Sequence, residues 1–140
     1  MTNIPKIGTV MIIDDDQIDQ MMYDRVIKRS GLIKKTVPFL YAEKALNYLK
    51  APESEPIHMI FLDINMPRMN GFEFLDRAIA ELGTKFTNLV VVMLTTSLHP
   101  DDKARADSYG VVKHFMAKPL NATSLQKVVS AYQTTMAVKQ

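Results

Sequence analysis

The chain has 140 residues, of which 47% are hydrophobic, and this length and composition suit one domain with a single core. The formal net charge is +2, with both signs interspersed, so neither a nucleic-acid footprint nor a polybasic membrane patch is indicated. The lack of cysteine excludes disulfides, thiol catalysis and cysteine zinc sites, and no stretch approaches the roughly 20 apolar residues of a membrane span. We therefore expect one cytoplasmic domain over residues 1–140, with its core at about 9–137 and no second domain.

Short apolar runs alternate with amphipathic segments along the chain, a pattern typical of repeated βα units with right-handed connections. The central runs are almost continuously apolar, as expected of parallel strands that are covered on both faces. The predicted strands span residues 9–13, 35–41, 57–62, 88–94 and 113–116. The predicted helices span residues 17–29, 42–50, 71–82, 101–109 and 123–136. These elements predict an α/β fold with a parallel sheet.

The first and third predicted strands both end in carboxylates. Asp14, Asp15 and Asp16 follow the first strand, and Asp63 follows the third. An aspartate at a strand-to-helix junction is typically an N-cap, so we assign Asp16 to capping and keep Asp14 and Asp15 as candidate ligands. Because the carboxyl ends of parallel strands line one crevice, the two acidic elements are expected to share a site.

Clustered carboxylates of this kind repel each other unless a cation lies between them. Oxygen-only ligands suit a hard divalent ion, and Mg²⁺ is usually held by one or two carboxylates together with water and phosphate oxygens. The sequence thus predicts Mg²⁺ as the cofactor, beside a phosphoryl group. Two further strand ends supply polar groups for such a ligand, since the fourth strand ends in Thr95 and Thr96 and the fifth ends in Lys118 before Pro119.

These four strand ends, in this order and with Met-Pro and Gly after Asp63, resemble the response-regulator receiver domain of two-component signalling. The chain is similar to the single-domain, chemotaxis-type receivers, and the resemblance covers about residues 9–137. It implies a flavodoxin-like fold, in which a doubly wound, five-stranded parallel sheet of order 2-1-3-4-5 is covered by five helices.

The resemblance also implies roles for the acidic residues. Asp63 would be the phosphoacceptor, and Asp14 and Asp15 would be the acidic pair of the metal site. Asp15 and Asp63 would contact Mg²⁺ directly, and Asn65 would add its backbone carbonyl.

The remaining implied roles concern the fourth and fifth strands. Thr95 would donate a hydrogen bond to a phosphoryl oxygen, Thr96 would offer a backbone N–H, and Lys118 would form an ion pair with the phosphoryl group. The switch aromatic of the family falls on Phe115, where many receivers carry a tyrosine. A phenylalanine can still switch by packing, but it lacks a hydroxyl for recognition.

The function implied by the resemblance is that of a stand-alone response regulator. It would accept a phosphoryl group from a sensor histidine kinase or a histidine phosphotransfer protein. It would then signal through a phosphorylation-dependent protein-binding face, or pass the phosphoryl group on. We expect a downstream protein target, no nucleic-acid or membrane partner, a monomer or weak homodimer, and no turnover of an external substrate beyond assistance with its own phosphorylation and dephosphorylation.

Two other functions were weighed against this one. A phosphate-independent interaction module with the same fold would be expected to have lost Asp63, the acidic pair or Lys118, and all of these are present. A metal-dependent phosphohydrolase would need a general-acid aspartate two residues after its nucleophile, where this chain has Asn65. Its short loops also leave little room for a cap domain over a substrate.

Overall fold

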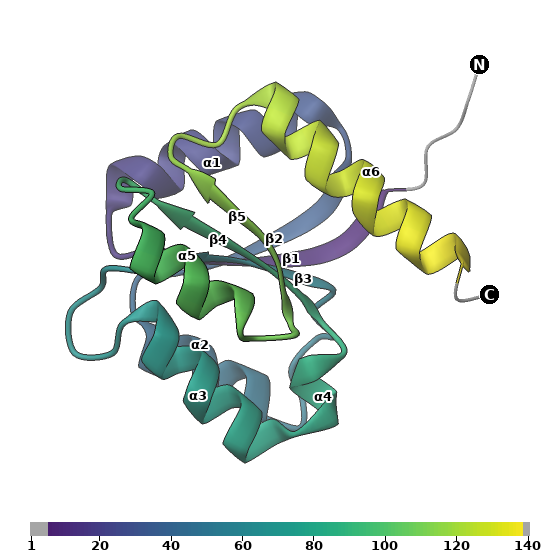
Figure 1. The fold of residues 1–140 in the computed structure, drawn as a ribbon. Helices are drawn as coiled ribbons and strands as arrows, with labels where there is room; N and C mark the ends of the chain where they lie inside the picture. Colours follow the sequence, from purple (N-terminus) through teal and green to yellow (C-terminus); the bar gives the residue numbers. More distant parts are fainter. Residues whose placement is uncertain (1–5, 139–140) are drawn as a thin grey trace.

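The computed structural model describes the backbone of residues 6–138 and the side chains of residues 6–135. Its five strands form one parallel sheet in the order β2-β1-β3-β4-β5, with helices on both faces (Figure 1), which confirms the predicted flavodoxin-like α/β fold. The strands are β1 (Ile7–Ile13), β2 (Ile33–Phe39), β3 (Met59–Asp63), β4 (Val90–Thr95) and β5 (Val112–Ala117). The helices are α1 (Gln17–Ser30), α2 (Ala42–Lys50), α3 (Gly71–Leu82), α4 (Thr84–Thr87), α5 (Pro100–Asp107) and α6 (Ala122–Val138). Within residues 6–138, no helix combines the length and the apolar character needed to cross a membrane.

The short helix α4 lies where the sequence predicted no helix, so the described residues contain six helices instead of five. It follows Gly83, whose positive φ of 59° lets the chain turn sharply after α3. Phe86 anchors it, because its ring is fully buried and lies edge-on to Phe74 with the ring centres 5.9 Å apart. A helix of four residues is too short to show a helical period, which is why the pattern missed it.

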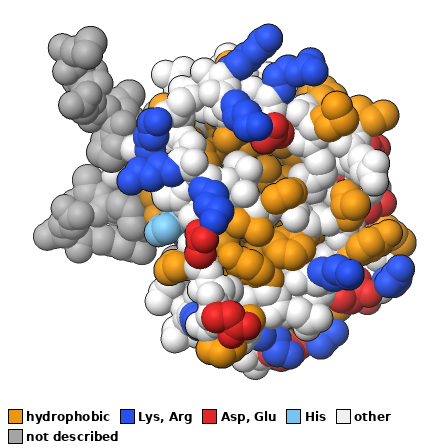
Figure 2. All heavy atoms as spheres, turned by 180° about the vertical axis from the view of Figure 1, so that it is seen from behind, with side chains coloured by type: hydrophobic (Ala, Val, Ile, Leu, Met, Phe, Trp, Pro, Cys, Tyr) orange, Lys and Arg blue, Asp and Glu red, His pale blue; other side chains and the backbone are white. Residues whose placement is uncertain are grey.

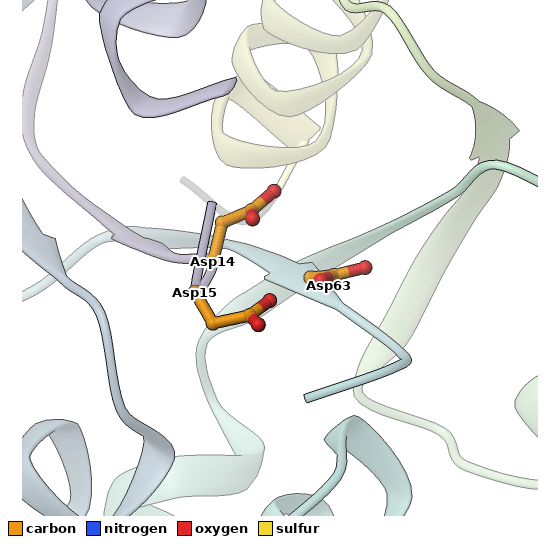
Figure 3. A group of neighbouring side chains, drawn as sticks. All are labelled: Asp14, Asp15 and Asp63. Carbon is orange, nitrogen blue, oxygen red and sulfur yellow. The ribbon is translucent and has the colours of Figure 1, made fainter. Parts of the chain in front are cut away.

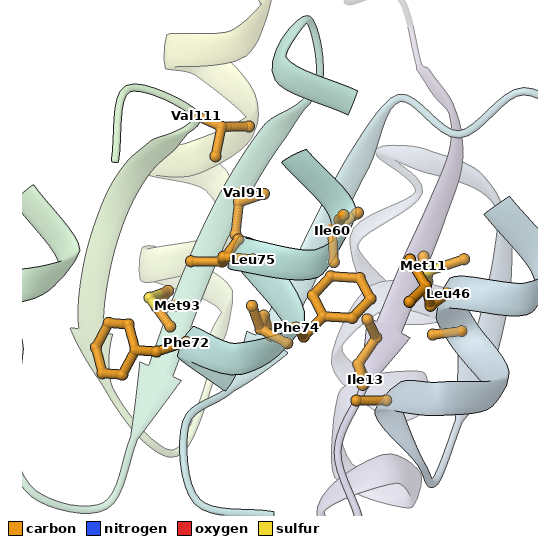
Figure 4. Close-up of a cluster of buried hydrophobic side chains, with 14 of the residues drawn as sticks. Met11, Ile13, Leu46, Ile60, Phe72, Phe74, Leu75, Val91, Met93 and Val111 are labelled. Atoms are coloured by element: carbon orange, nitrogen blue, oxygen red, sulfur yellow. The ribbon is translucent and has the colours of Figure 1, made fainter. Parts of the chain in front are cut away.

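Side chains of the central strands alternate between two cores, one on each face of the sheet. On the face covered by α2, α3 and α5, Ile13, Ile60 and Met93 share a cluster with Phe72 and Phe74 (Figure 4). Alternate residues of the same strands pack under α1 and α6 on the other face. Because both faces are covered, every residue of β3 and β4 is buried. This double cover accounts for the continuous apolar runs in the sequence.

The strand register brings the candidate site residues to one edge of the sheet. Asp14 directly follows β1 and Asp63 is the last residue of the adjacent strand β3. The residues just before them, Ile13 and Leu62, are paired. Lys118 likewise directly follows the residue of β5 that pairs with Thr95 of β4. Four strand ends therefore meet at the C-terminal edge, as the sequence predicted.

Charged side chains of both signs lie among apolar groups on the surface, as Figure 2 shows for the face opposite to that of Figure 1. Some form pairs along a helix, such as Lys28 with Asp24 and Arg77 with Glu81, both at 2.9 Å. Exposed pairs of this kind contribute at most about 1 kcal/mol each. The two cores therefore stabilise the fold far more than its surface ion pairs do.

Candidate functional site

A polar cleft of about 570 Å³ opens at the C-terminal edge of the sheet. Asp15, Asp63, Asn65 and Lys118 are among the residues that line it. Figure 3 shows Asp14, Asp15 and Asp63 extending from the ends of β1 and β3, and one oxygen of each carboxylate lies within 4.8 Å of the others. The structure thus brings the acidic residues that the sequence selected into one cluster beside the predicted lysine.

Asp14 is the most enclosed member of this cluster, with 1% of its surface exposed. Asp16 is confirmed as the N-cap of α1, and its backbone N–H donates to one Asp14 oxygen at 2.9 Å. The other oxygen accepts from the Tyr23 hydroxyl at 2.9 Å and lies 2.7 Å from the Lys118 ammonium. Burial and the charge of Asp14 raise the pKa of Tyr23, so this hydroxyl keeps its proton. Both oxygens of Asp14 are therefore already bound by groups of the chain.

Lys118 brings an ammonium group into the middle of the carboxylates. Its Nζ lies 2.7 Å from Asp14, 2.9 Å from Asp19 and 3.3 Å from Asp63. Burial lowers the pKa of Lys118, but hydrogen bonds to Asp14 and Asp19 outweigh burial and leave the pKa above its ordinary value. The side chain is therefore a fixed positive charge. The peptide bond from Lys118 to Pro119 is cis.

Asp63 is buried, and its charge is only partly balanced. Burial and the charge of Asp14 raise the pKa of Asp63 to about 6, while Lys118 acts in the opposite direction. A divalent cation would relieve this excess of negative charge. Asp15 is exposed, Asp63 lines the cleft, and Asn65 lies beside them, so the available donors are oxygens. This donor set fits Mg²⁺.

The loop after β3 fixes the backbone that carries Asp63. Asn70 caps α3 and forms a capping box with Glu73. The N–H of Gly71 donates to the carbonyl of Ile64 at 2.8 Å. A Cβ atom at Gly71 would lie only 2.6 Å from the backbone oxygen of Asp63. The start of α3 therefore packs directly against the end of β3, and only glycine leaves enough room there.

Three predicted residues do not line the cleft: the enclosed Asp14, and Thr95 and Phe115 of the fourth and fifth strands. The Thr95 hydroxyl is buried in a local turn, where it donates to the Ser97 carbonyl at 3.0 Å and accepts from the Ser97 N–H at 3.1 Å. Phe115 is partly buried and lines a separate hollow of about 270 Å³ with Leu98. Thr96, by contrast, lines the cleft itself.

Three residues of α1 belong to the site although the sequence analysis did not select them. Asp19 contacts Lys118, Tyr23 donates to Asp14, and the amide nitrogen of Gln20 lies 3.1 Å from the backbone oxygen of Asp14. These three positions lie three, four and seven residues after the N-cap, so they share one face of the helix. That spacing is the signal that could have identified them.

The raised pKa of Asp63 predicts a pH-dependent stability. Between about pH 4, the ordinary pKa of an aspartate, and about pH 6, the folded state holds a proton that the unfolded chain has lost, so the folded state loses stability as the pH rises. Above about pH 6, the charge on buried Asp63 lowers the free energy of unfolding of the metal-free protein by about 3 kcal/mol. We expect Asp63→Asn to raise the free energy of unfolding by about 2–3 kcal/mol at pH 7.5 in a chelator, and to change it little at pH 4.

Urea denaturation of both proteins at the two pH values measures this difference. Adding Mg²⁺ should stabilise the wild type and reduce the advantage of the asparagine variant. A variant that is less stable than the wild type at pH 7.5 without Mg²⁺ would contradict the prediction. In that case the pairing of Asp63 with Lys118 outweighs the cost of burial.

Comparison with known proteins agrees with this geometry. The chain is 25% identical over 128 residues to the "Hybrid signal transduction histidine kinase L" of Dictyostelium discoideum, covering 90% of this chain but 7% of that protein. It is 29% identical to the "Probable methanogenesis regulatory protein FilR2" of Methanothrix harundinacea, covering 86% of this chain and 77% of that protein. It is 28% identical to the "Sensor histidine kinase CheAY" of Helicobacter pylori, covering 91% of this chain and 15% of that protein. The chain thus spans only a small part of the two kinases.

Solved structures and a family model point the same way. The crystal structure of a two-component response regulator from Cytophaga hutchinsonii is similar with a TM-score of 0.83 and 28% identity, covering 92% of this chain and 98% of that one. The chemotaxis protein CheY4 of Vibrio cholerae has the same fold, with a TM-score of 0.73 and 24% identity. The match covers 90% of this chain and 98% of that one. The model of the response regulator receiver domain matches residues 10–130. The chain therefore belongs to the response regulator receiver domain family of two-component signalling.

Proposed function

We propose that Asp63 is the phosphoacceptor of this receiver domain, and that it takes its phosphoryl group from a phosphohistidine on a sensor histidine kinase or a histidine phosphotransfer protein. The observation that carries the proposal is the meeting of Asp63 with the acidic pair and Lys118 in an open polar cleft. A buried structural ion pair would need no such opening. Here the acceptor carboxylate lines a space that a phosphoryl group can enter.

The transfer uses Asp63 as the nucleophile. With a pKa of about 6, its carboxylate is mostly ionised at neutral pH. One carboxylate oxygen forms a bond to phosphorus while the bond from phosphorus to the donor imidazole nitrogen breaks, and the imidazole keeps the electron pair. Lys118 offers a fixed cation to the phosphoryl oxygens, in line with electrostatic stabilisation of such transfers.

The metal site is proposed on the same residues. Mg²⁺ would be held by Asp15, Asp63 and the backbone carbonyl of Asn65. Asp14 would attract the ion by its negative charge without contacting it. Its oxygens are occupied by the chain, which favours this indirect role over direct ligation. When bound, Mg²⁺ neutralises charge on the phosphoryl oxygens and on the acceptor.

The proposed response to phosphorylation begins at Thr95. The Thr95 hydroxyl is hydrogen-bonded to the backbone of Ser97. These hydrogen bonds would have to break before the hydroxyl could reach a phosphoryl oxygen. That movement would pull the loop after β4 inward and leave space for Phe115, which is only partly buried. We propose that the face made by α5, β5 and α6 changes shape in this way and binds the target.

Apolar side chains beside the cleft support a protein as the phosphoryl donor. Ile18 lines the cleft with 69% of its surface exposed, and Met21, one helical turn further along α1, is 65% exposed. Leu98, in the loop after β4, is 57% exposed. Exposed methionines are adaptable contact residues in binding surfaces. A small-molecule substrate would gain little from Met21 and Leu98, which are not among the residues that line the cleft.

The wider setting belongs to the same proposal. We place the protein in the cytoplasm, where histidine kinases obtain their ATP, and assign it no external substrate to turn over. We propose that it acts as a monomer or weak homodimer.

The test is the intact mass of the protein after incubation with acetyl phosphate and Mg²⁺. We expect one hydroxylamine-labile phosphoryl group on the wild type and none on Asp63→Asn or in the presence of a chelator. Asp24→Asn, which removes an exposed carboxylate of α1 that pairs with Lys28, should be labelled like the wild type. A wild type that gains no phosphoryl group and binds no beryllofluoride would instead support the phosphate-independent interaction module.

A further inference from the structure

Asp19 differs from the other carboxylates around Lys118 in the structural element that carries it. The others follow β1 and β3, whereas Asp19 lies in the first turn of α1. Its Oδ2 accepts from the Lys118 ammonium at 2.9 Å, and within the described residues this is its one side-chain hydrogen bond. The helix N-terminus favours a negative charge at this position.

The ammonium of Lys118 has three protons, and three carboxylates surround it. Phosphorylation converts the Asp63 carboxylate into an acyl phosphate, so Asp14 and Asp19 are then the carboxylates that compete with the phosphoryl oxygens for Lys118. These two differ in how easily they can release it. Asp14 is 1% exposed and would be left buried beside Tyr23, while the Asp19 side chain is 27% exposed and can be hydrated when released.

We propose that Asp19 is a positioning residue that holds Lys118 in the unphosphorylated protein and competes with the phosphoryl group for it. This inference rests on the proposed function of Asp63. When the phosphoryl group forms, Lys118 turns from Asp19 to the phosphoryl oxygens, and Asp19 becomes hydrated. The first turn of α1 then loses its link to Lys118, directly beside the exposed Ile18. Phosphorylation is thereby coupled to the helix that borders the cleft.

The proposed competition predicts in which direction the affinity for a phosphoryl analogue changes when Asp19 is replaced. Removing the charge of Asp19 frees Lys118 for the phosphoryl group. Asp19→Asn should therefore bind beryllofluoride roughly fivefold more tightly than the wild type, a factor expected for a partly exposed ion pair. The phosphorylated variant should also lose its phosphoryl group correspondingly more slowly. The same change also removes negative charge near the metal site, which weakens Mg²⁺ binding. The titrations are therefore made at saturating Mg²⁺, with Mg²⁺ affinity measured separately.

The experiment compares four proteins by NMR-monitored titration with beryllofluoride: the wild type, Asp19→Asn, Asp19→Glu and Asp24→Asn. Asp19→Glu restores the carboxylate and should return the affinity to the wild-type value. Asp24→Asn, on the same helix but paired with Lys28, should leave it unchanged. The ¹⁵N signal of the Lys118 ammonium, recorded without Mg²⁺ or beryllofluoride, should shift in Asp19→Asn alone.

The outcomes separate the two proposals. Normal uptake of beryllofluoride by the wild type, with equal or weaker binding by Asp19→Asn, would overturn the competition and leave Asp63 as the acceptor. A Lys118 signal that is unchanged in Asp19→Asn would overturn the pairing itself. Wild-type protein that takes up no beryllofluoride would overturn the proposed function, and the competition with it.

Discussion

Gly71→Ala is expected to destabilise the protein by about 2–3 kcal/mol, although alanine is ordinarily the better helix former. The added Cβ would lie 2.6 Å from the backbone oxygen of Asp63 and 3.1 Å from the Cα of Ile64, and neither backbone atom can move without shifting the end of β3. Thermal unfolding should show a midpoint lower by about 6–10 °C. Because the shift displaces Asp63 itself, labelling by acetyl phosphate should also slow.

Gly110→Ala is the matched control for this prediction. No atom lies within 4 Å of a Cβ built at Gly110, and its φ is not in the positive range. Its replacement should change the stability by less than about 0.5 kcal/mol. If Gly71→Ala proved as stable as Gly110→Ala, the close packing of α3 against the end of β3 would be wrong.

The acidic cluster could be predicted from the sequence because its signal is local. Asp14 and Asp63 each end an apolar run, and one general rule, that parallel strands finish at the same edge of the sheet, brings such residues together. Asp16 was predicted for a similar reason, since an N-cap depends only on the residues just after it. The lysine at the end of β5 followed from the same rule.

Other features of the site depend on distances that no local pattern contains. Asp19 looks like an ordinary first-turn acid in the sequence, and its pairing with Lys118 requires residues 99 positions apart to meet. Thr95 was expected to face a phosphoryl group, but its hydroxyl bonds Ser97 in this structure. The helix α4 is held by the packing of Phe86 against a distant ring, not by its own propensity.

Lys118→Met should destabilise the metal-free protein at pH 7.5 by about 3 kcal/mol, because it leaves the buried carboxylates of Asp14 and Asp63 without their cation. Lys113→Met, which removes an exposed lysine of the same strand, should change the stability by less than about 0.5 kcal/mol. Both are measured by urea denaturation in a chelator.

A double-mutant cycle shows where the loss comes from. If charge repulsion is the cause, combining Lys118→Met with Asp63→Asn should recover much of the lost stability, since only Asp14 then remains as a buried charge with an unmet partner. Added Mg²⁺ should also recover part of it in the single variant, because a divalent cation near Asp63 and Asp15 replaces the missing positive charge. Strictly additive effects in the cycle would mean that Lys118 stabilises the fold through Asp14 and Asp19 and not through Asp63. The ammonium would then have no electrostatic link to Asp63, and its proposed role toward the phosphoryl group would lose its physical basis.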